Sequence, residues 1–153
     1  MALDAKVMGA MPSRADTGAS GNNLRAHSNH PNADGRPPRI PYPKAAYEMI
    51  ELLRKCIENQ ASDLHLAVGR PPVIRINGTL RDIDGDDLSP VEARRLIYGV
   101  LNDAEKQKFE EEKELDFSLA VSNLGRFRAN IHLQRGTLAA AFRAIDSVIR
   151  NFK

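Results

Sequence analysis

The chain has 153 residues, a formal net charge of +2 and one cysteine. This length suits one domain with its own core rather than two large domains, and so small a net charge gives no general attraction to nucleic acid or to anionic membranes. A single cysteine excludes an intrachain disulfide, and no apolar run approaches the roughly 20 residues of a membrane span. Because the N-terminus lacks a signal-peptide pattern, we expect a cytoplasmic protein.

The first 43 residues hold most of the prolines, with Gly, Ser and Asn between them. Such a segment buries too little apolar surface to offset its ordering entropy, so residues 1–43 are predicted to form a disordered extension. Residues 36–43 favour polyproline II and are interpreted as a stiff linker, with a ligand for a partner groove as the alternative. His27 and His30 have no helix to bring them together, so no metal site is predicted there.

The predicted domain covers residues 44–146. A helix is expected over 44–60, because apolar residues recur there at helical spacing, and Cys56 among them is predicted to be a buried thiol. Asn77-Gly78 predicts a two-residue hairpin turn. The strands expected in this half occupy residues 61–66, 73–77 and 79–83.

The second half is expected to contain two helices and three strands. Ser89 and Glu92 have the spacing of a capping box with Pro90 between them, which predicts a helix from 90 to about 101. A charged helix over 104–114 follows. From Leu115 the apolar period changes to two, and the expected strands occupy residues 115–121, 126–133 and 138–145. This order predicts an α+β domain, a mostly antiparallel sheet with helices on one face, which residues 147–153 then leave.

Alternation along the strands also predicts a polar sheet face rich in arginine. The arginines assigned to it are Arg75, Arg81, Arg126, Arg128 and Arg143. Guanidinium groups on a rigid sheet suit a phosphate, because each offers a planar fork of donors and keeps its charge. The alternative is a solvated face with ion pairs to Asp63, Asp82 and Asp116. RNA binding is a further candidate, weakened by the lack of interleaved aromatic residues.

The sequence contains no motif from which a complete catalytic site could be built. His65 and His132 have no partner at catalytic spacing and are interpreted as polar-face or core histidines. The phosphate-binding motif G-x-x-x-x-G-K-[ST] is not present, since no glycine is followed by lysine, and no zinc-ligand cluster or nucleophile elbow appears. We therefore predict no catalytic residue, no metal site, no cofactor bound by this chain alone and no ATP hydrolysis by it.

Several blocks of the sequence carry a resemblance. Ala-Ser-Asp-Leu-His-Leu at 61–66, then Gly69-x-Pro71-Pro72 and Ile74-Arg75-x-x-Gly78, are similar to the opening signature of the PilT/PilB/GspE family of secretion ATPases, and within it to the retraction ATPases of type IV pili. Further matching blocks lie at residues 96–98, 102–103, 109–111, 115–118, 126–130 and 142–145. The stretch from 44 to about 153 thus resembles the complete N-terminal domain of that family.

The resemblance implies a PAS-like domain in a hexameric ring, where it packs on the RecA-like ATPase core of a neighbouring subunit. It implies ATP and Mg²⁺ in the full-length family, the type IV pilus machinery as partner, no nucleic acid and no direct membrane insertion. Carried over by position, the candidate nucleotide-facing or subunit-interface arginines are Arg75, Arg81, Arg128 and Arg143. The RecA-like core itself is not in this sequence, residues 147–153 match the start of the interdomain linker, and the 43-residue extension departs from the family pattern.

Three hypotheses follow. The leading one is an N-terminal assembly and nucleotide-gating module of a PilT-type ATPase that powers pilus retraction and twitching motility. The first alternative is a stand-alone adaptor or regulator that docks on a full-length pilus or secretion ATPase. The second is a PAS-like sensor of a small ligand, which needs an internal pocket with converging polar groups.

Overall fold

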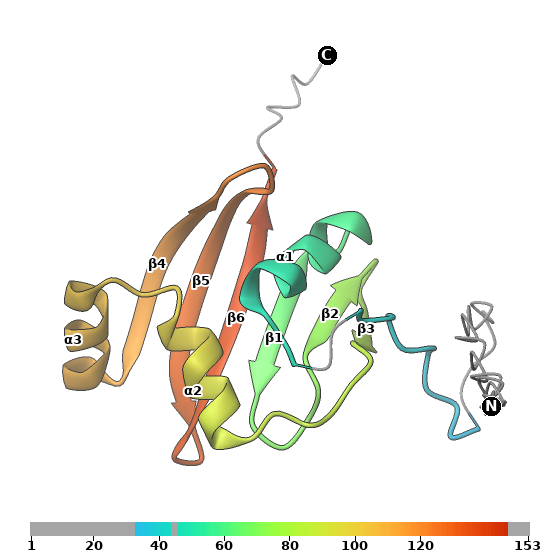
Figure 1. Ribbon diagram of the computed structural model, residues 1–153, viewed down its shortest axis with the longest axis horizontal. Helices are drawn as coiled ribbons and strands as arrows, with labels where there is room; N and C mark the ends of the chain where they lie inside the picture. Colours follow the sequence, from blue (N-terminus) through green and yellow to red (C-terminus); the bar gives the residue numbers. More distant parts are fainter. Residues whose placement is uncertain (1–32, 44–45, 147–153) are drawn as a thin grey trace, which may run out of the picture.

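The computed structural model describes residues 33–43 and 46–146, which form one sheet with helices packed against it (Figure 1). The elements in chain order are α1 (Met49–Glu58), β1 (Asp63–Ala67), β2 (Val73–Ile76), β3 (Thr79–Asp82), α2 (Pro90–Tyr98), α3 (Asp103–Glu112), β4 (Glu114–Val121), β5 (Gly125–Gln134) and β6 (Thr137–Ile145). The strand order is β3-β2-β1-β6-β5-β4, and every neighbouring pair is antiparallel. The predicted α+β class with a mostly antiparallel sheet is thereby confirmed, whereas the PAS-like description stays a prediction.

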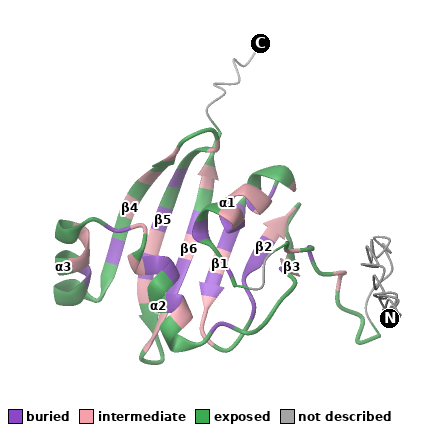
Figure 2. Ribbon diagram, viewed as in Figure 1, coloured by how far each residue is buried: buried purple, intermediate pink, exposed green. Residues whose placement is uncertain are grey.

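Helices α1 and α2 lie across one face of the sheet, and α3 lies beside the β4 edge (Figure 1). The strand residues that face the helices are apolar and buried, and burial follows the middle of the sheet (Figure 2). Leu64 of β1 lies directly opposite Phe142 of β6, which in turn lies opposite Ala129 of β5. Because successive side chains alternate between faces, the residues between these apolar positions occupy the other, helix-free face.

Two short sequence signals are confirmed. Asn77 and Gly78 have φ values of 47° and 81°, the positive pair that a type I′ hairpin turn between β2 and β3 requires. Ser89 and Glu92 form both hydrogen bonds of a capping box at the start of α2. Cys56 is fully buried, and burial raises the pKa of its thiol to about 12, so the predicted buried thiol is also confirmed.

The predicted helix boundaries were less accurate. Helix α1 begins at Met49 rather than at residue 44, because Glu48 is extended, with φ −122°, and Tyr47 folds back against a turn. The Tyr47 hydroxyl donates to the Asp86 carbonyl at 2.9 Å, and its ring lies 5.2 Å from that of Tyr42. Helix α2 ends at Tyr98, three residues before the predicted end, and Gly99 follows it.

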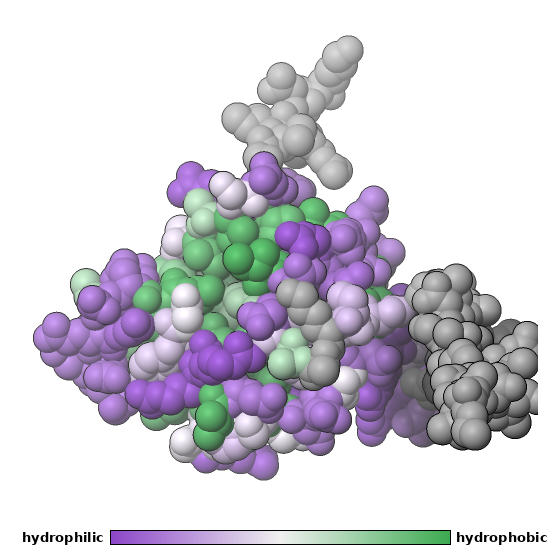
Figure 3. All heavy atoms as spheres, in the orientation of Figure 1, coloured by the Kyte–Doolittle hydropathy of each residue, from purple (hydrophilic) through white to green (hydrophobic). Residues whose placement is uncertain are grey.

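Not all of the apolar residues that recur at helical spacing in these helices are buried. Ile50 is 54% exposed and Val91 is 78% exposed, while Ile57 also reaches solvent. The buried stripe of α1 consists of Met49, Leu52, Leu53 and Cys56. Figure 3 views this helix-covered side, where apolar side chains gather among hydrophilic ones. When a short helix has more apolar residues than one buried stripe needs, its sequence does not show which of two adjacent rows faces the core.

Part of the predicted disordered extension is ordered. Residues 1–32 lie outside the described residues, but Ile40 is buried and bridges Ile83 beyond the end of β3. The Ile40 N–H donates to the Asp82 carbonyl at 2.8 Å, and the Ile40 carbonyl accepts from the Asp84 N–H at 2.7 Å. The buried Ile40 side chain and these two backbone hydrogen bonds thus attach the segment to the core at the sheet edge.

Arg81 fastens the same segment. Its guanidinium donates to the Pro38 carbonyl from Nε at 3.0 Å and from Nη2 at 2.9 Å. Replacing Arg81 with alanine should therefore cost roughly 1–2 kcal/mol of local stability and speed hydrogen exchange at the Ile40 and Asp84 amides, because a charge-assisted pair of bonds is lost. Exchange followed by NMR would show this.

Arg70→Ala is the matched control. It removes an exposed 3.4 Å ion pair with Asp82 at the same sheet edge but leaves the Pro38 carbonyl bonded. Unchanged exchange at Ile40 in the Arg81 variant, or equal acceleration in both variants, would show that Arg81 does not hold the segment.

Candidate functional site

Charged side chains cross the helix-free face of the sheet in a single row. The strand register places Arg75, Asp63, Arg143 and Arg128 directly opposite one another on β2, β1, β6 and β5 in turn. We call these four residues, three arginines and one aspartate, the arginine row. Three arginines against one aspartate leave the row positive. The predicted arginine-rich face is confirmed for Arg75, Arg126, Arg128 and Arg143, of which Arg126 lies outside the row.

Arg81 does not belong to the arginine row. It lies directly opposite Ile74, whose side chain is buried on the helix side of the sheet, so Arg81 is on the other face. Its placement with Arg75 was wrong because β3 enters the sheet through a two-residue turn, and the register of that hairpin decides which residues share a face. The structure gives Arg81 the contact with Pro38 instead.

Asp63 is the centre of the arginine row. Its side chain is only 8% exposed and accepts from Arg143 Nε at 3.0 Å, while Arg75 Nε lies 3.5 Å from the other carboxylate oxygen. The Ser62 hydroxyl adds a third contact at 2.7 Å. Both arginines use Nε on Asp63, and the described residues show no partner for their terminal nitrogens. Those nitrogens remain available to an anion outside the domain.

The environment of Asp63 favours its charged form. Burial by itself would raise the pKa of this carboxyl, but hydrogen bonds from Ser62 and Arg143, together with the positive charge of Arg143, outweigh it and lower the pKa below the ordinary 3.8. Asp63 therefore adds stability that is fully present above its unfolded pKa and is lost as the pH falls through the folded value.

This linkage predicts the behaviour of Asp63→Asn. The variant should lose about 1–3 kcal/mol of unfolding free energy at neutral pH, because charge-assisted bonds to a buried carboxylate are removed. Its stability should also fall less than that of the wild type between about pH 5 and pH 2. Urea unfolding across this pH range measures both effects.

Asp116→Asn is the matched control for this experiment. Asp116 is exposed on the same face, and no ion pair to it occurs within the described residues. The alternative interpretation, a solvated sheet face, predicted ion pairs at Asp63, Asp82 and Asp116. Among the described residues, ion pairs form at Asp63 and Asp82 but not at Asp116. If both variants lost the same unfolding free energy, Asp63 would not stabilise the domain more than an exposed aspartate on the same face does.

Arg128 completes the row on β5 with no ion-pair partner in the part of the chain that the structure describes. It is exposed and lies directly opposite Arg143, and like charges in that position repel. A cavity of about 290 Å³, open to solvent, lies between the two arginines and is also lined by Asp63, Asp116, Asn130 and Ala141. An anion bound there would relieve the repulsion.

The two histidines that sequence analysis set aside also lie on this face. His65 is half-buried, and its Nε2 is buried without a hydrogen-bond partner in the described structure. His132 Nδ1 is 3.0 Å from Asn130 Oδ1. Sequence reasoning missed the surroundings of His65, although a signal was present: the three consecutive alanines 139–141 in β6 leave space beside any larger neighbour on the sheet.

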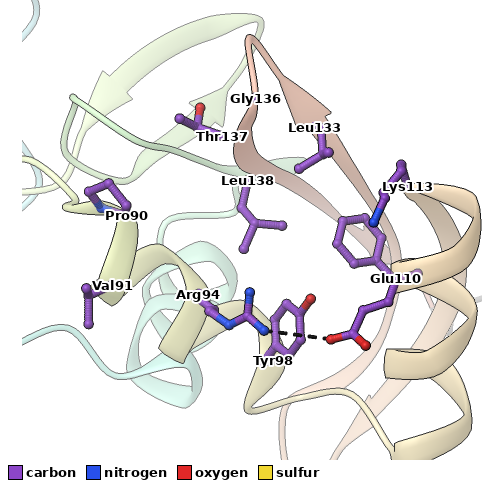
Figure 4. A pocket seen from close by; sticks show the side chains of 11 residues that line it. Pro90, Val91, Arg94, Tyr98, Glu110, Lys113, Leu133, Gly136, Thr137 and Leu138 are labelled. Carbon is purple, nitrogen blue, oxygen red and sulfur yellow. Dashed lines mark ion pairs between the residues drawn. The ribbon is translucent and has the colours of Figure 1, made fainter.

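A second hollow, on the helix side, has a structural explanation. It measures about 590 Å³ and lies between α2, α3 and the β5–β6 turn (Figure 4). The Arg94 guanidinium lies 4.3 Å from the centre of the Tyr98 ring and 3.7 Å from Glu110, while Tyr98 meets Phe109 edge to face. These contacts hold α3 against α2, and they already pair Arg94 with Glu110 among the polar groups that line the hollow.

Other classes of site find no support among the described residues. Within residues 33–43 and 46–146, no three acidic, histidine or cysteine side chains are grouped as a metal site would need. In the same ranges no helix has both the length and the apolar character needed to cross a bilayer. The arginine row and its hollows are therefore the candidate site.

Comparisons with known proteins show what this chain is similar to. No protein-family model matches the chain. Curated relatives do: the type IV pilus retraction ATPase PilT of Pseudomonas aeruginosa is 40% identical over 102 residues, 67% of this chain and 30% of the relative. The type IV pilus ATPase PilU of the same species is 32% identical over 102 residues, and a twitching motility protein of Neisseria gonorrhoeae is 32% identical over 105.

Solved structures give the same result. A crystal structure of the pilus retraction motor PilT with bound ADP matches with a TM-score of 0.63 at 40% identity, covering 67% of this chain and 30% of that one. The Legionella pneumophila ATPase DotB matches with a TM-score of 0.62 at 21% identity, a likeness of fold alone.

The fold and the sequence relatives make this domain similar to the N-terminal region of type IV pilus ATPases. More particularly, the chain is homologous to the N-terminal region of PilT and PilU. It spans just under a third of the length of these curated relatives.

Proposed function

We propose that this chain is the N-terminal assembly and nucleotide-gating module of a PilT-type hexameric ATPase that powers type IV pilus retraction. The observation that carries the proposal is the arginine row, on a helix-free sheet face of a domain homologous to PilT. The domain is proposed to be PAS-like and cytoplasmic, and to act beside the pilus machinery.

The chemistry of the row supports gating in trans. Phosphoryl transfer depends on positioning and on stabilising the negative charge that spreads over the transferred group. A guanidinium held by its Nε on Asp63 presents its terminal nitrogens in a fixed fork, which matches phosphate oxygens. In a ring of head-to-tail subunits, the face of one domain meets a different surface of its neighbour, so the row can reach a nucleotide held by the neighbour's ATPase core. ATP and Mg²⁺ would then be bound by that core.

The test is a chimera in which residues 33–146 replace the matching region of Pseudomonas aeruginosa PilT, so that the contacts of Pro38 and Ile40 with the domain are kept. We expect the chimera to form rings, to hydrolyse ATP and to restore twitching in cells that lack PilT. Native mass spectrometry, a phosphate-release assay and a motility plate measure the three outcomes. A folded chimera that stays monomeric and inactive beside active parental PilT would contradict the proposal.

The adaptor alternative predicts a different result. A stand-alone regulator should bind full-length PilT when the two are mixed as separate chains and should change its rate of ATP hydrolysis. A module that works only within its own ring should have no effect when added in this way. Pull-down and hydrolysis assays with residues 1–153 therefore separate the two functions.

A further inference from the structure

A small hollow next to the arginine row has an unusual lining. It measures about 250 Å³ and is floored by Ala67, Ala139 and Ala141 on β1 and β6. Ala67 lies directly opposite Ala139, and Ala141 directly opposite His65. Because alanine side chains end at Cβ, longer neighbours stand above the floor on both sides. The walls come from His65, Arg70, Arg75, Leu80, His132 and Gln134.

The polar groups of this hollow are incompletely bonded. His65 Nε2 is buried and has no hydrogen-bond partner in the described part of the chain, which is costly for a polar atom. Arg70 contacts Asp82 through Nη2, and Arg75 contacts Asp63 through Nε, so each guanidinium keeps further donors. The hollow thus combines an apolar floor with unsatisfied donors and excess positive charge on its walls.

We propose that the hollow receives an aspartate or glutamate side chain from a partner protein, which under the proposed function is the neighbouring subunit. The methylene groups of such a side chain can pack on the alanine floor while its carboxylate reaches Arg70 and Arg75 and lies beside the His65 ring. A free inorganic oxyanion fits less well, because it would place charge against the apolar floor. The inference rests on the proposed function for the identity of the partner, but not for the chemistry of the hollow.

Electrostatics around His65 give the contact a pH dependence. Burial lowers the pKa of His65, Asp63 on the same strand opposes this, and Arg75, Arg70 and Arg143 lower it further. Of the other residues that line the hollow, His132 on β5 is titratable, and Asp82 on β3 pairs with Arg70 beside it. A carboxylate in the hollow would favour the protonated ring, so its binding should strengthen as the pH falls below the ordinary histidine value of about 6.5.

The test uses residues 1–153 with sodium propionate, which has the chemistry of a glutamate side chain. NMR should show saturable shifts at the His65 ring and the Ala139 and Ala141 methyl groups, together with a raised pKa of His65. Ala141→Leu fills the hollow without changing charge and should weaken binding by about tenfold or more. Ala120→Leu, on the same face but on β4, is the matched control and should bind as the wild type does.

Two further measurements distinguish a carboxylate site from a general anion site and test the role of Arg70. Sodium sulfate should shift these signals less than propionate at equal ionic strength, and equal or tighter sulfate binding would overturn the carboxylate assignment. Arg70→Gln, at an exposed turn, should also weaken propionate binding by about tenfold, which keeps the test usable if Ala141→Leu unfolds. Unsaturable shifts, or shifts unaffected by both variants, would contradict the proposal.

The same variants in the PilT chimera separate this inference from the proposed function. If the chimera fails to assemble but the chain binds propionate, the proposed function fails and the hollow remains a carboxylate site. If the chimera assembles and Ala141→Leu leaves ring formation unchanged, the hollow is not the contact and the proposed function stands.

Discussion

Replacing Arg128 with alanine in the PilT chimera is expected to lower ATP hydrolysis by about 10³-fold while changing the unfolding free energy by less than about 0.5 kcal/mol. The hydrolysis loss follows if the arginine row supplies charge to a neighbour's nucleotide. The unchanged stability follows from the geometry, since Arg128 is exposed and the described residues include no ion-pair partner for it. Removing it also relieves its repulsion with Arg143, directly opposite. Phosphate release and urea unfolding measure the two quantities.

Arg126→Ala is the control for this prediction. Arg126 lies two residues earlier on β5, on the same face, but opposite Ile145 rather than in the row. It should leave hydrolysis within a few-fold of the parent chimera. Equal loss in both variants would mean that the face acts through its overall charge, and no loss in either would show that Arg128 does not approach the nucleotide.

Sequence reasoning located most of this site because strands have a simple period. Alternation alone put Arg75, Arg128 and Arg143 on a face away from the core, and the blocks around them identified the homology. Arg81 was misplaced although the predicted two-residue turn at Asn77-Gly78 already fixes the register of β3 on β2. That register pairs Arg81 with the buried Ile74, so alternation along β3 had to be counted from the turn.

Features that depend on contacts distant in sequence were harder to predict. Asp63 meets Arg143 across 80 positions of the chain, and nothing local shows that both arginines share its carboxylate. The anchoring of Ile40 likewise depends on space at the end of β3, which composition cannot reveal. The hollow beside His65 exists only because small residues on two strands become neighbours in the sheet.

The core that supports the arginine row gives the largest expected loss of stability. Phe142 is fully buried on β6 and lies between Leu64 of β1 and Ala129 of β5. Truncation to alanine should cost about 3–5 kcal/mol, because it removes a large apolar side chain and leaves a cavity that two central strands border. This is a large share of the roughly 5–15 kcal/mol that stabilises a typical domain. Urea unfolding followed by circular dichroism measures it.

Phe117→Ala provides the comparison. Phe117 faces the same side of the sheet, but it is half-buried on the edge strand β4. Its truncation should cost less than that of Phe142, because the site can relax toward solvent. Phe142 also precedes Arg143 in the chain, with the two side chains on opposite faces, so a cavity under β6 should loosen the contact between Arg143 and Asp63. If both phenylalanine variants lose equal stability, β6 is not the centre of the core. If Phe142→Ala instead weakens the domain without disturbing the Arg143 signals in NMR, the arginine row is held by its own ion pairs rather than by the packing beneath it.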